Sequence, residues 1–292
     1  MDFVAKGQDL VAKANKRLSS FSLFGGGSKY EDAAEMYEKA ANQFKLGKAW
    51  NEAGDAYIKL AEVQIKLESK HDAASAWVEA AKALLKSDQK RAVVCLQQAV
   101  SLYTDMGRLG MAARQLREIA EVMEKEGNKE ESIMFYEQAA DLFATENSTS
   151  EANKCNLKIA QFAAELERYP QAIQIYEEVA RTSVENNLLK YSAKGHLLNA
   201  GICQLCSADV ASIRAAIDRY RDIDLNFDNS RECNFLSTLA DALDEGDVEA
   251  FTNAVAEFDS LTRLDAWKTT LLVRVKRKIT SRQEDVEEED LT

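Results

Sequence analysis

Two pairs of residues have the types that metal or redox chemistry needs. Cys203 and Cys206 form a C-x-x-C pair, but no second cysteine pair or histidine cluster accompanies it. His71 and His196 are the two histidines of the chain, and neither has a metal-ligating residue three or four positions further on. We therefore predict buried structural thiols, structural or surface histidines, and no metal site.

Two further patterns are weak candidates for catalysis. The run GGGSK at 25–29 contains the residues of a phosphate-binding loop, but it lacks the G-x-x-x-x-G-K-[ST] spacing and no strand precedes it. Adjacent acids such as Glu130 and Glu131 are typical of solvated helix faces. We expect no enzymatic activity and no cofactor.

The composition indicates a helical protein. Ala, Glu, Lys and Leu dominate the 292 residues, which include a single proline. No apolar run approaches the roughly 20 residues that span a bilayer, the N-terminus lacks a signal-peptide pattern, and an odd count of five cysteines suits reduced thiols. A net charge of −12 argues against nucleic-acid binding. We expect a cytoplasmic protein.

A repeat of 19 or 20 residues runs from residue 33 to about residue 184. Each repeat has a small leading residue, a large residue four positions later and another small residue at position seven or eight, all on one helical face. Asn156 breaks the pattern, and we expect Leu157 to take the buried role there. The leading residues are Ala33, Ala53, Ala73, Ala92, Ala112, Ser132, Ala152 and Ala172.

This period predicts the architecture. A helix of about four turns with a short connection forces successive helices to run antiparallel, and stacked hairpins form a solenoid. After residue 184 the register fades, and we expect helices at 188–206, 209–223, 235–246, 247–261 and 264–280. We therefore predict an all-α fold, a right-handed TPR-like solenoid of antiparallel helical hairpins capped by a C-terminal helical bundle.

Four parts of the chain follow from this interpretation. They are an N-terminal helix with an apolar loop at 1–29, the solenoid at 30–184, the helical bundle at 185–282 and a disordered acidic tail at 283–292. The tail prediction rests on charge, because six acids between residues 284 and 290 supply half of the net negative charge.

Six stretches in unbroken order resemble the α-SNAP (soluble NSF attachment protein) family from about residue 19 onward. They are FSLFGGGSK, LYTDMGR, ANKC, LLKYSAK, DSLTRLDAW and EEEDLT. The resemblance implies an adaptor that binds the assembled SNARE four-helix bundle, made of syntaxin-like, synaptobrevin-like and SNAP-25-like chains. It also implies that the adaptor recruits and stimulates the hexameric ATPase NSF, which disassembles SNARE complexes in vesicle trafficking and membrane fusion.

The resemblance also implies which residues make these contacts. The positions matching the family's basic SNARE contacts are Arg108, Arg114, Lys154, Lys158, Lys194 and Arg231. The positions matching its NSF contacts are Asp241, Asp244, Glu245, Glu288, Glu289, Asp290 and Leu291. Arg114 stands where the family often has lysine, and Asp241 and Asp244 replace glutamates, so the geometry of these contacts differs. Without the resemblance, the basic positions would be interpreted as solvated helix faces with ordinary ion pairs.

The loop residues Phe21, Leu23 and Phe24 raise a separate question. Three glycines follow them, and Lys13, Lys16, Arg17 and Lys29 flank them, with no acid between residues 10 and 30. The apolar side chains could pack on the first repeat or insert into a membrane. Because the implied target is anchored in a membrane, we expect a membrane-attachment loop and peripheral association with membranes.

Two other functions fit the same architecture. One is a general TPR-like peptide-binding scaffold, and the other is a purely structural coat subunit. Both would leave the acidic ending EEEDLT without a role, so removing that ending would distinguish them from the adaptor.

Overall fold

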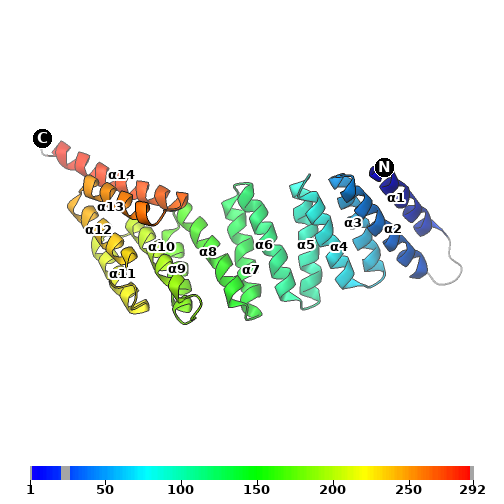
Figure 1. The fold of residues 1–292 in the computed structure, drawn as a ribbon, viewed down its shortest axis with the longest axis horizontal. Coiled ribbons are helices and arrows are strands. Elements are labelled where there is room, and N and C mark those ends of the chain that lie inside the picture. The colour runs from blue at the N-terminus through cyan, green and yellow to red at the C-terminus, as the bar shows by residue number, and fades with distance from the viewer. Residues whose placement is uncertain (1, 21–26, 290–292) are drawn as a thin grey trace. The chain divides into compact units, whose positions relative to one another are not determined.

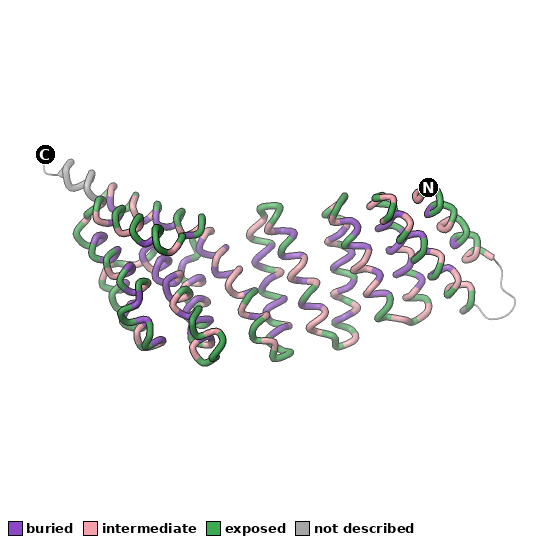
Figure 2. Tube along the Cα trace, viewed as in Figure 1, coloured by how far each residue is buried: buried purple, intermediate pink, exposed green. Residues whose placement is uncertain are grey.

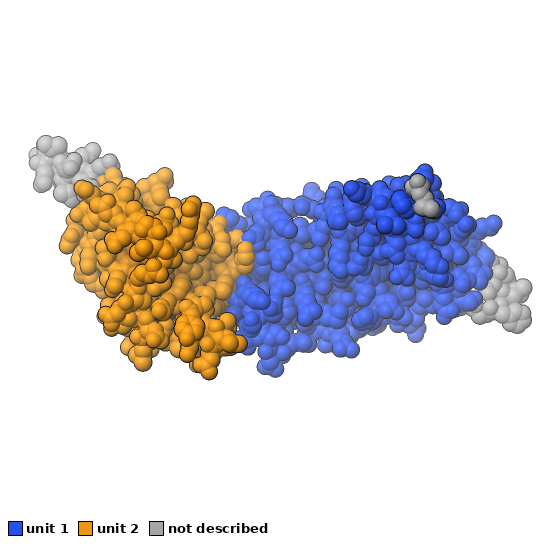
Figure 3. Space-filling view, viewed as in Figure 1, with its two compact units in different colours: residues 1–155 blue, residues 156–292 orange. Residues whose placement is uncertain are grey.

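The computed structural model describes residues 2–20 and 27–289 of the chain. Over these residues the protein has fourteen α-helices, one short 3-10 helix and no strand (Figure 1). It divides into two compact units, residues 1–155 and residues 156–292 (Figure 3). The predicted all-α, TPR-like fold is confirmed.

The first unit is a succession of helices in which each helix from α1 to α6 packs on the next. Its helices are α1 (Phe3–Ser19), α2 (Gly27–Leu46), α3 (Trp50–Lys66), α4 (Lys70–Leu84), α5 (Gln89–Asp105), α6 (Leu109–Lys125), α7 (Lys129–Thr145) and the start of α8 (Thr149–Glu165). α8 ends in the second unit. Figure 2 shows buried positions running along these helices.

The predicted repeat forms the core of the stack. All eight leading residues are at most 5% exposed, and the one polar member, Ser132, donates its hydroxyl to the Ala120 carbonyl over 2.9 Å. Gly54 makes a still closer approach possible, because a Cβ at this position would lie 2.5 Å from the Leu84 Cγ atom. Small residues thus let the helices pack closely.

Left-handed residues end most of the helices of the stack. A positive φ recurs at the spacing of the repeat, at Lys48, Glu68, Gly107, Gly127, Asn147 and Glu167. A residue in this conformation stops the helix and turns the chain back. Its amide is hydrogen-bonded into the preceding turn, as in Glu68, whose N–H donates to the Ile65 carbonyl over 3.0 Å.

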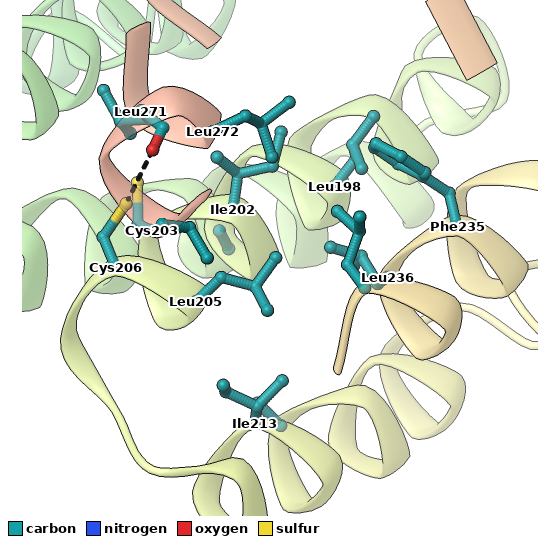
Figure 4. Close-up of a cluster of buried hydrophobic side chains, with 14 of the residues drawn as sticks. Leu198, Ile202, Cys203, Leu205, Cys206, Ile213, Phe235, Leu236, Leu271 and Leu272 are labelled. Carbon is teal, nitrogen blue, oxygen red and sulfur yellow. Dashed lines mark hydrogen bonds between the residues drawn. The ribbon is translucent and has the colours of Figure 1, made fainter. Parts of the chain in front are cut away.

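The second unit is a helical bundle with α10 at its centre. Its helices after α8 are α9 (Tyr169–Val184), the 3-10 helix η1 (Lys190–Ser192), α10 (Ala193–Ser207), α11 (Val210–Ile223), α12 (Arg231–Glu245), α13 (Val248–Leu261) and α14 (Ala266–Glu289). Figure 4 shows side chains of α10 among those of α11, α12 and α14. Leu197, Ile202 and Leu205 of α10 are at most 1% exposed.

Buried cysteines occur in both units, as the sequence predicts. All five are free and buried. Burial raises the pKa of the Cys206 thiol to about 11, and its Sγ lies 3.6 Å from the Leu271 carbonyl oxygen of α14. Thiols in this state are poor nucleophiles, because the reactive form is the thiolate.

Three details differ from the sequence predictions. The division between the units falls after Cys155 rather than near residue 184, because Tyr176 of α9 shares a core with Leu197 of α10. The helix expected from residue 188 begins only at Ala193. The tail expected to be disordered from residue 283 is helical to Glu289, since Arg, Gln and Glu favour helix and extend one that is already nucleated.

Candidate functional surfaces

The basic positions of the first unit lie on α6 and α8. Arg108 is the N-cap of α6 and Arg114 lies within that helix; both are exposed, and neither forms an ion pair with a described residue. Lys154 of α8 differs, because its Nζ lies 2.5 Å from the Glu151 carboxylate. Arg117 of α6 binds the same carboxylate, and the hydrogen bonds from Lys154 and Arg117 lower the pKa of Glu151.

The basic positions of the second unit are Lys158, Lys194 and Arg231. Lys158 lies over the ring of Phe162, 5.7 Å from its centroid. Lys194 is half-buried in the first turn of α10, and Arg231 is the exposed first residue of α12. Neither of the last two forms an ion pair with any part of the chain that the structure describes. In a chain with an excess of acids, such cations are available to an anionic partner.

Two large apolar side chains that the sequence does not mark as contacts are exposed shortly before Lys194 in the chain. Leu188 is 89% exposed and Tyr191 is 79% exposed, in the connection between α9 and α10. The Lys190 Nζ lies 5.4 Å from the Tyr191 ring centroid. One sequence feature could have identified them. The repeat ends near residue 184, so these large side chains do not belong to the buried face of any repeat helix.

The acidic positions of the second unit are held by a neighbouring helix. Arg214 of α11 donates from one Nη2 to the carboxylates of Asp241 and Asp244 on α12, over 3.0 Å each. Glu245 is exposed and forms no ion pair with a described residue. The sequence did not predict Arg214, because it lies 27 and 30 residues before its partners. One guanidinium between two carboxylates leaves a net negative charge and fixes both side chains.

The remaining predicted contacts belong to the C-terminal end of the chain and to the segment between α1 and α2. The backbone of Glu288 and Glu289 belongs to α14. Asp290, Leu291, Phe21, Leu23 and Phe24 lie outside the described residues.

The basic flank of the apolar loop is less free than the sequence suggested. The Lys13 Nζ lies 2.6 Å from the Asp9 carboxylate, and the Arg17 Nε lies 2.8 Å from the Asp32 carboxylate. Both acids fall just outside the acid-free window of residues 10–30. Lys16 and Lys29 form no ion pair with a described residue.

A separate acidic groove crosses α2, α3 and α4. Two cavities of about 340 and 380 Å³ share Glu38 and Gln64, and their lining includes the carboxylates of Glu31, Asp72 and Glu79. Among the described residues, no lysine or arginine lines either cavity. Lysines beside the groove neutralise part of its charge, because Glu79 pairs with Lys45 and Lys82, and Glu35 pairs with Lys39.

Titratable groups elsewhere do not converge on a reactive centre. No group of three or more His, Cys, Asp and Glu side chains among the described residues could hold a metal ion. His196 is largely buried, and burial together with Lys268 lowers its pKa. None of the described helices combines the length and apolar character needed to cross a bilayer.

The chain is similar over nearly its whole length to proteins of one known family. Residues 5–280 match the family model described as "Soluble NSF attachment protein, SNAP". The chain is 53% identical over 291 residues to an alpha-soluble NSF attachment protein of Vitis vinifera, covering 100% of this chain and 99% of the relative. It is 43% identical over 288 residues to the alpha-soluble NSF attachment protein of Homo sapiens, covering 97% of each chain. It is 37% identical over 287 residues to a probable vesicular-fusion protein sec17 homolog of Schizosaccharomyces pombe, covering 97% and 99%. The chain therefore belongs to the soluble NSF attachment protein (SNAP) family.

Proposed function

We propose that this protein is an adaptor that binds assembled SNARE complexes and recruits and stimulates the NSF ATPase, which then separates the SNARE chains. Family membership supports the role, since the relatives are named for attachment of NSF or for vesicular fusion. The adaptor catalyses no reaction of its own; it brings the SNARE complex and the NSF ATPase together. It works in the cytoplasm and associates peripherally with membranes.

The observation that carries the SNARE half of the proposal is the set of cations without ion-pair partners. Arg108, Arg114, Lys194 and Arg231 form no ion pair with described residues, although the chain carries twelve more acids than bases. An acidic helical bundle would satisfy these charges, and the attraction would be screened by salt.

The NSF half of the proposal rests on the acids of the second unit. Asp241, Asp244 and Glu245 present carboxylates on α12, and α14 leads into the acidic tail with Leu291 near its end. A basic groove on the ATPase is the complementary surface. The segment with Phe21, Leu23 and Phe24 adds a membrane contact next to the anchored SNARE bundle, which raises the effective concentration of the adaptor.

Co-sedimentation with purified components tests this function directly. The wild-type chain should sediment with a SNARE bundle, should bring NSF into the pellet only when the bundle is present, and should raise ATP hydrolysis by NSF. If less of the chain sediments with the SNARE bundle at high salt than at low salt, the result would agree with a charged interface. A chain that sediments with NSF in the absence of any SNARE protein, and not with the bundle, would contradict the proposal.

A further inference from the structure

The carboxylate of Glu151, in the first turn of α8, lies between two cations. Its Oε1 atom accepts a hydrogen bond from the Lys154 Nζ atom over 2.5 Å, three residues later on the same helix. Its Oε2 atom accepts a hydrogen bond from the Arg117 guanidinium of α6, which lies 34 residues earlier in the chain. The hydrogen bonds from Lys154 and Arg117 lower the pKa of Glu151, so this carboxylate is ionised at neutral pH. Each carboxylate oxygen therefore has its own charged donor.

Arg117 is the inner of the two cations. Its side chain is 29% exposed, whereas that of Lys154 is 63% exposed. The guanidinium carbon of Arg117 lies 5.6 Å from the ring centroid of Phe143 on α7, and its Nε atom lies 3.8 Å from the Glu121 carboxylate. Contacts with α7 and α8 thus hold the guanidinium beside Glu151.

This difference in exposure decides which cation neutralises Glu151. Water and salt screen a partly buried ion pair less than an exposed one, so Arg117 is the stronger partner. The pair of Glu151 with Lys154 is closer to the exposed pairs that contribute little free energy. Glu121 offsets the charge of Arg117 only weakly, because it is further away and half exposed. An ammonium has three N–H donors, so Lys154 keeps both charge and donors toward solvent.

We propose that Arg117 is a positioning residue for SNARE binding: it holds Glu151 and so leaves the charge of Lys154 available to the SNARE bundle. The inference rests on the proposed function, in which Lys154 is a SNARE contact. Without Arg117, the Glu151 carboxylate would neutralise Lys154 and would repel an acidic partner. Arg117 and Glu151 form one ion pair, yet one favours binding and the other opposes it.

Arg117→Met tests this proposal, because methionine keeps an unbranched apolar stem against Phe143 and removes the charge. The probe is an assembled SNARE bundle without membrane anchors, and calorimetry measures its affinity for the full chain. Arg117→Met should weaken binding about five-fold. Glu151→Gln should bind at least as tightly as wild type. In the Glu151→Gln background, Arg117→Met should cost less than about two-fold, because no carboxylate is left to neutralise Lys154.

Arg91→Met is the matched control. Arg91 of α5 binds the Asp55 carboxylate of α3, so it also links two helices of the first unit. No lysine in the described part of the chain forms an ion pair with Asp55. Arg91→Met therefore removes the same charge and the same kind of ion pair, and it should leave binding unchanged.

The two members of the ion pair separate this role from a structural one. Arg117→Met and Glu151→Gln break the same pair, so a structural role predicts that both weaken binding. Weaker binding by Glu151→Gln would therefore overturn the inference, and this variant carries the test alone if Arg117→Met unfolds at the assay temperature. Wild-type affinity of Arg117→Met, or an equal loss in both backgrounds, would also overturn it while leaving the adaptor role intact. No binding by the wild-type chain would overturn both.

Discussion

The guanidinium of Arg274 on α14 donates a hydrogen bond to the backbone carbonyl of Glu165, the last residue of α8, over 3.1 Å. The same side chain donates to the Ala164 carbonyl over 3.4 Å and to the Tyr169 hydroxyl over 3.2 Å. The last carbonyls of a helix have no partner within it and carry partial negative charge. Arg274 therefore fixes the C-terminal helix of the second unit to the end of α8.

We predict that Arg274→Ala lowers the free energy of unfolding by about 2–3 kcal/mol, because it leaves partly buried carbonyls without a charged donor. Arg277→Ala is the control: this residue is exposed on the same helix, and its loss should cost less than about 0.5 kcal/mol. Urea denaturation followed by circular dichroism measures both. Equal effects of the two substitutions would show that Arg274 adds nothing beyond its charge.

A second prediction concerns the basic positions of the first unit. The pair Arg114→Glu and Lys154→Glu should weaken binding of a SNARE bundle about ten-fold or more, since two attractive charges become repulsive. Stability should change little, because Arg114 has no ion-pair partner among described residues and the Lys154 side chain, which pairs with Glu151, is 63% exposed.

The matched control for this double variant is Lys66→Glu with Lys70→Glu. It makes the same change in net charge at exposed positions near the junction of α3 and α4. Isothermal titration calorimetry at two salt concentrations reports the affinities. If both double variants lose affinity equally, binding depends on net charge alone and the assignment of Arg114 and Lys154 is wrong.

The repeat made the hairpin stack predictable. It could not predict the side-chain contacts between helices that lie far apart in the sequence. The spacing of Ala33, Ala53 and their successors reports directly which face of each helix is buried, because small residues there allow close packing. Arg214 and Arg274 bind partners 27 to 110 residues away, and no periodic pattern marks such pairs. The exposed Leu188 and Tyr191 were missed for a related reason: they lie where the periodicity stops. The charged contact positions came from the family resemblance and not from the periodicity, and they stay predictions.

A third prediction uses the left-handed turns. Glu68 ends α3 with φ +58°, a conformation that strains a residue with a Cβ. Glu68→Gly should raise the free energy of unfolding by about 0.5 kcal/mol, since the relief of strain exceeds the added freedom of the unfolded chain. Gly107 has φ +67° with open space around it, so Gly107→Ala should cost about 1 kcal/mol through backbone strain alone. Thermal denaturation of both variants checks the opposite signs.

A fourth prediction concerns the acids of α12. Replacing Asp241 and Asp244 with asparagine should lower the stimulation of NSF several-fold while SNARE binding and stability stay near wild type. Their pairs with Arg214 are exposed, so they contribute little to folding. Glu52→Gln with Glu62→Gln removes the same two charges from exposed positions of the first unit and should leave stimulation unchanged. Normal stimulation by the α12 variant would mean that the ATPase does not contact these carboxylates.

The last prediction concerns Phe21 and Phe24, which lie between the end of α1 and the start of α2. Inserting each aromatic side chain into a bilayer is worth about 1.5–3 kcal/mol, whereas each nearby free cation adds about 1 kcal/mol at an anionic surface. The pairs of Lys13 with Asp9 and Arg17 with Asp32 reduce the charge component, so the apolar component should dominate. Phe21→Ser with Phe24→Ser should therefore slow disassembly of SNARE complexes in liposomes and spare complexes without anchors. Lys16→Ala with Lys29→Ala should have the smaller effect on liposomes. An equal loss with anchored and anchor-free complexes would show that the phenylalanines support the fold and not membrane attachment.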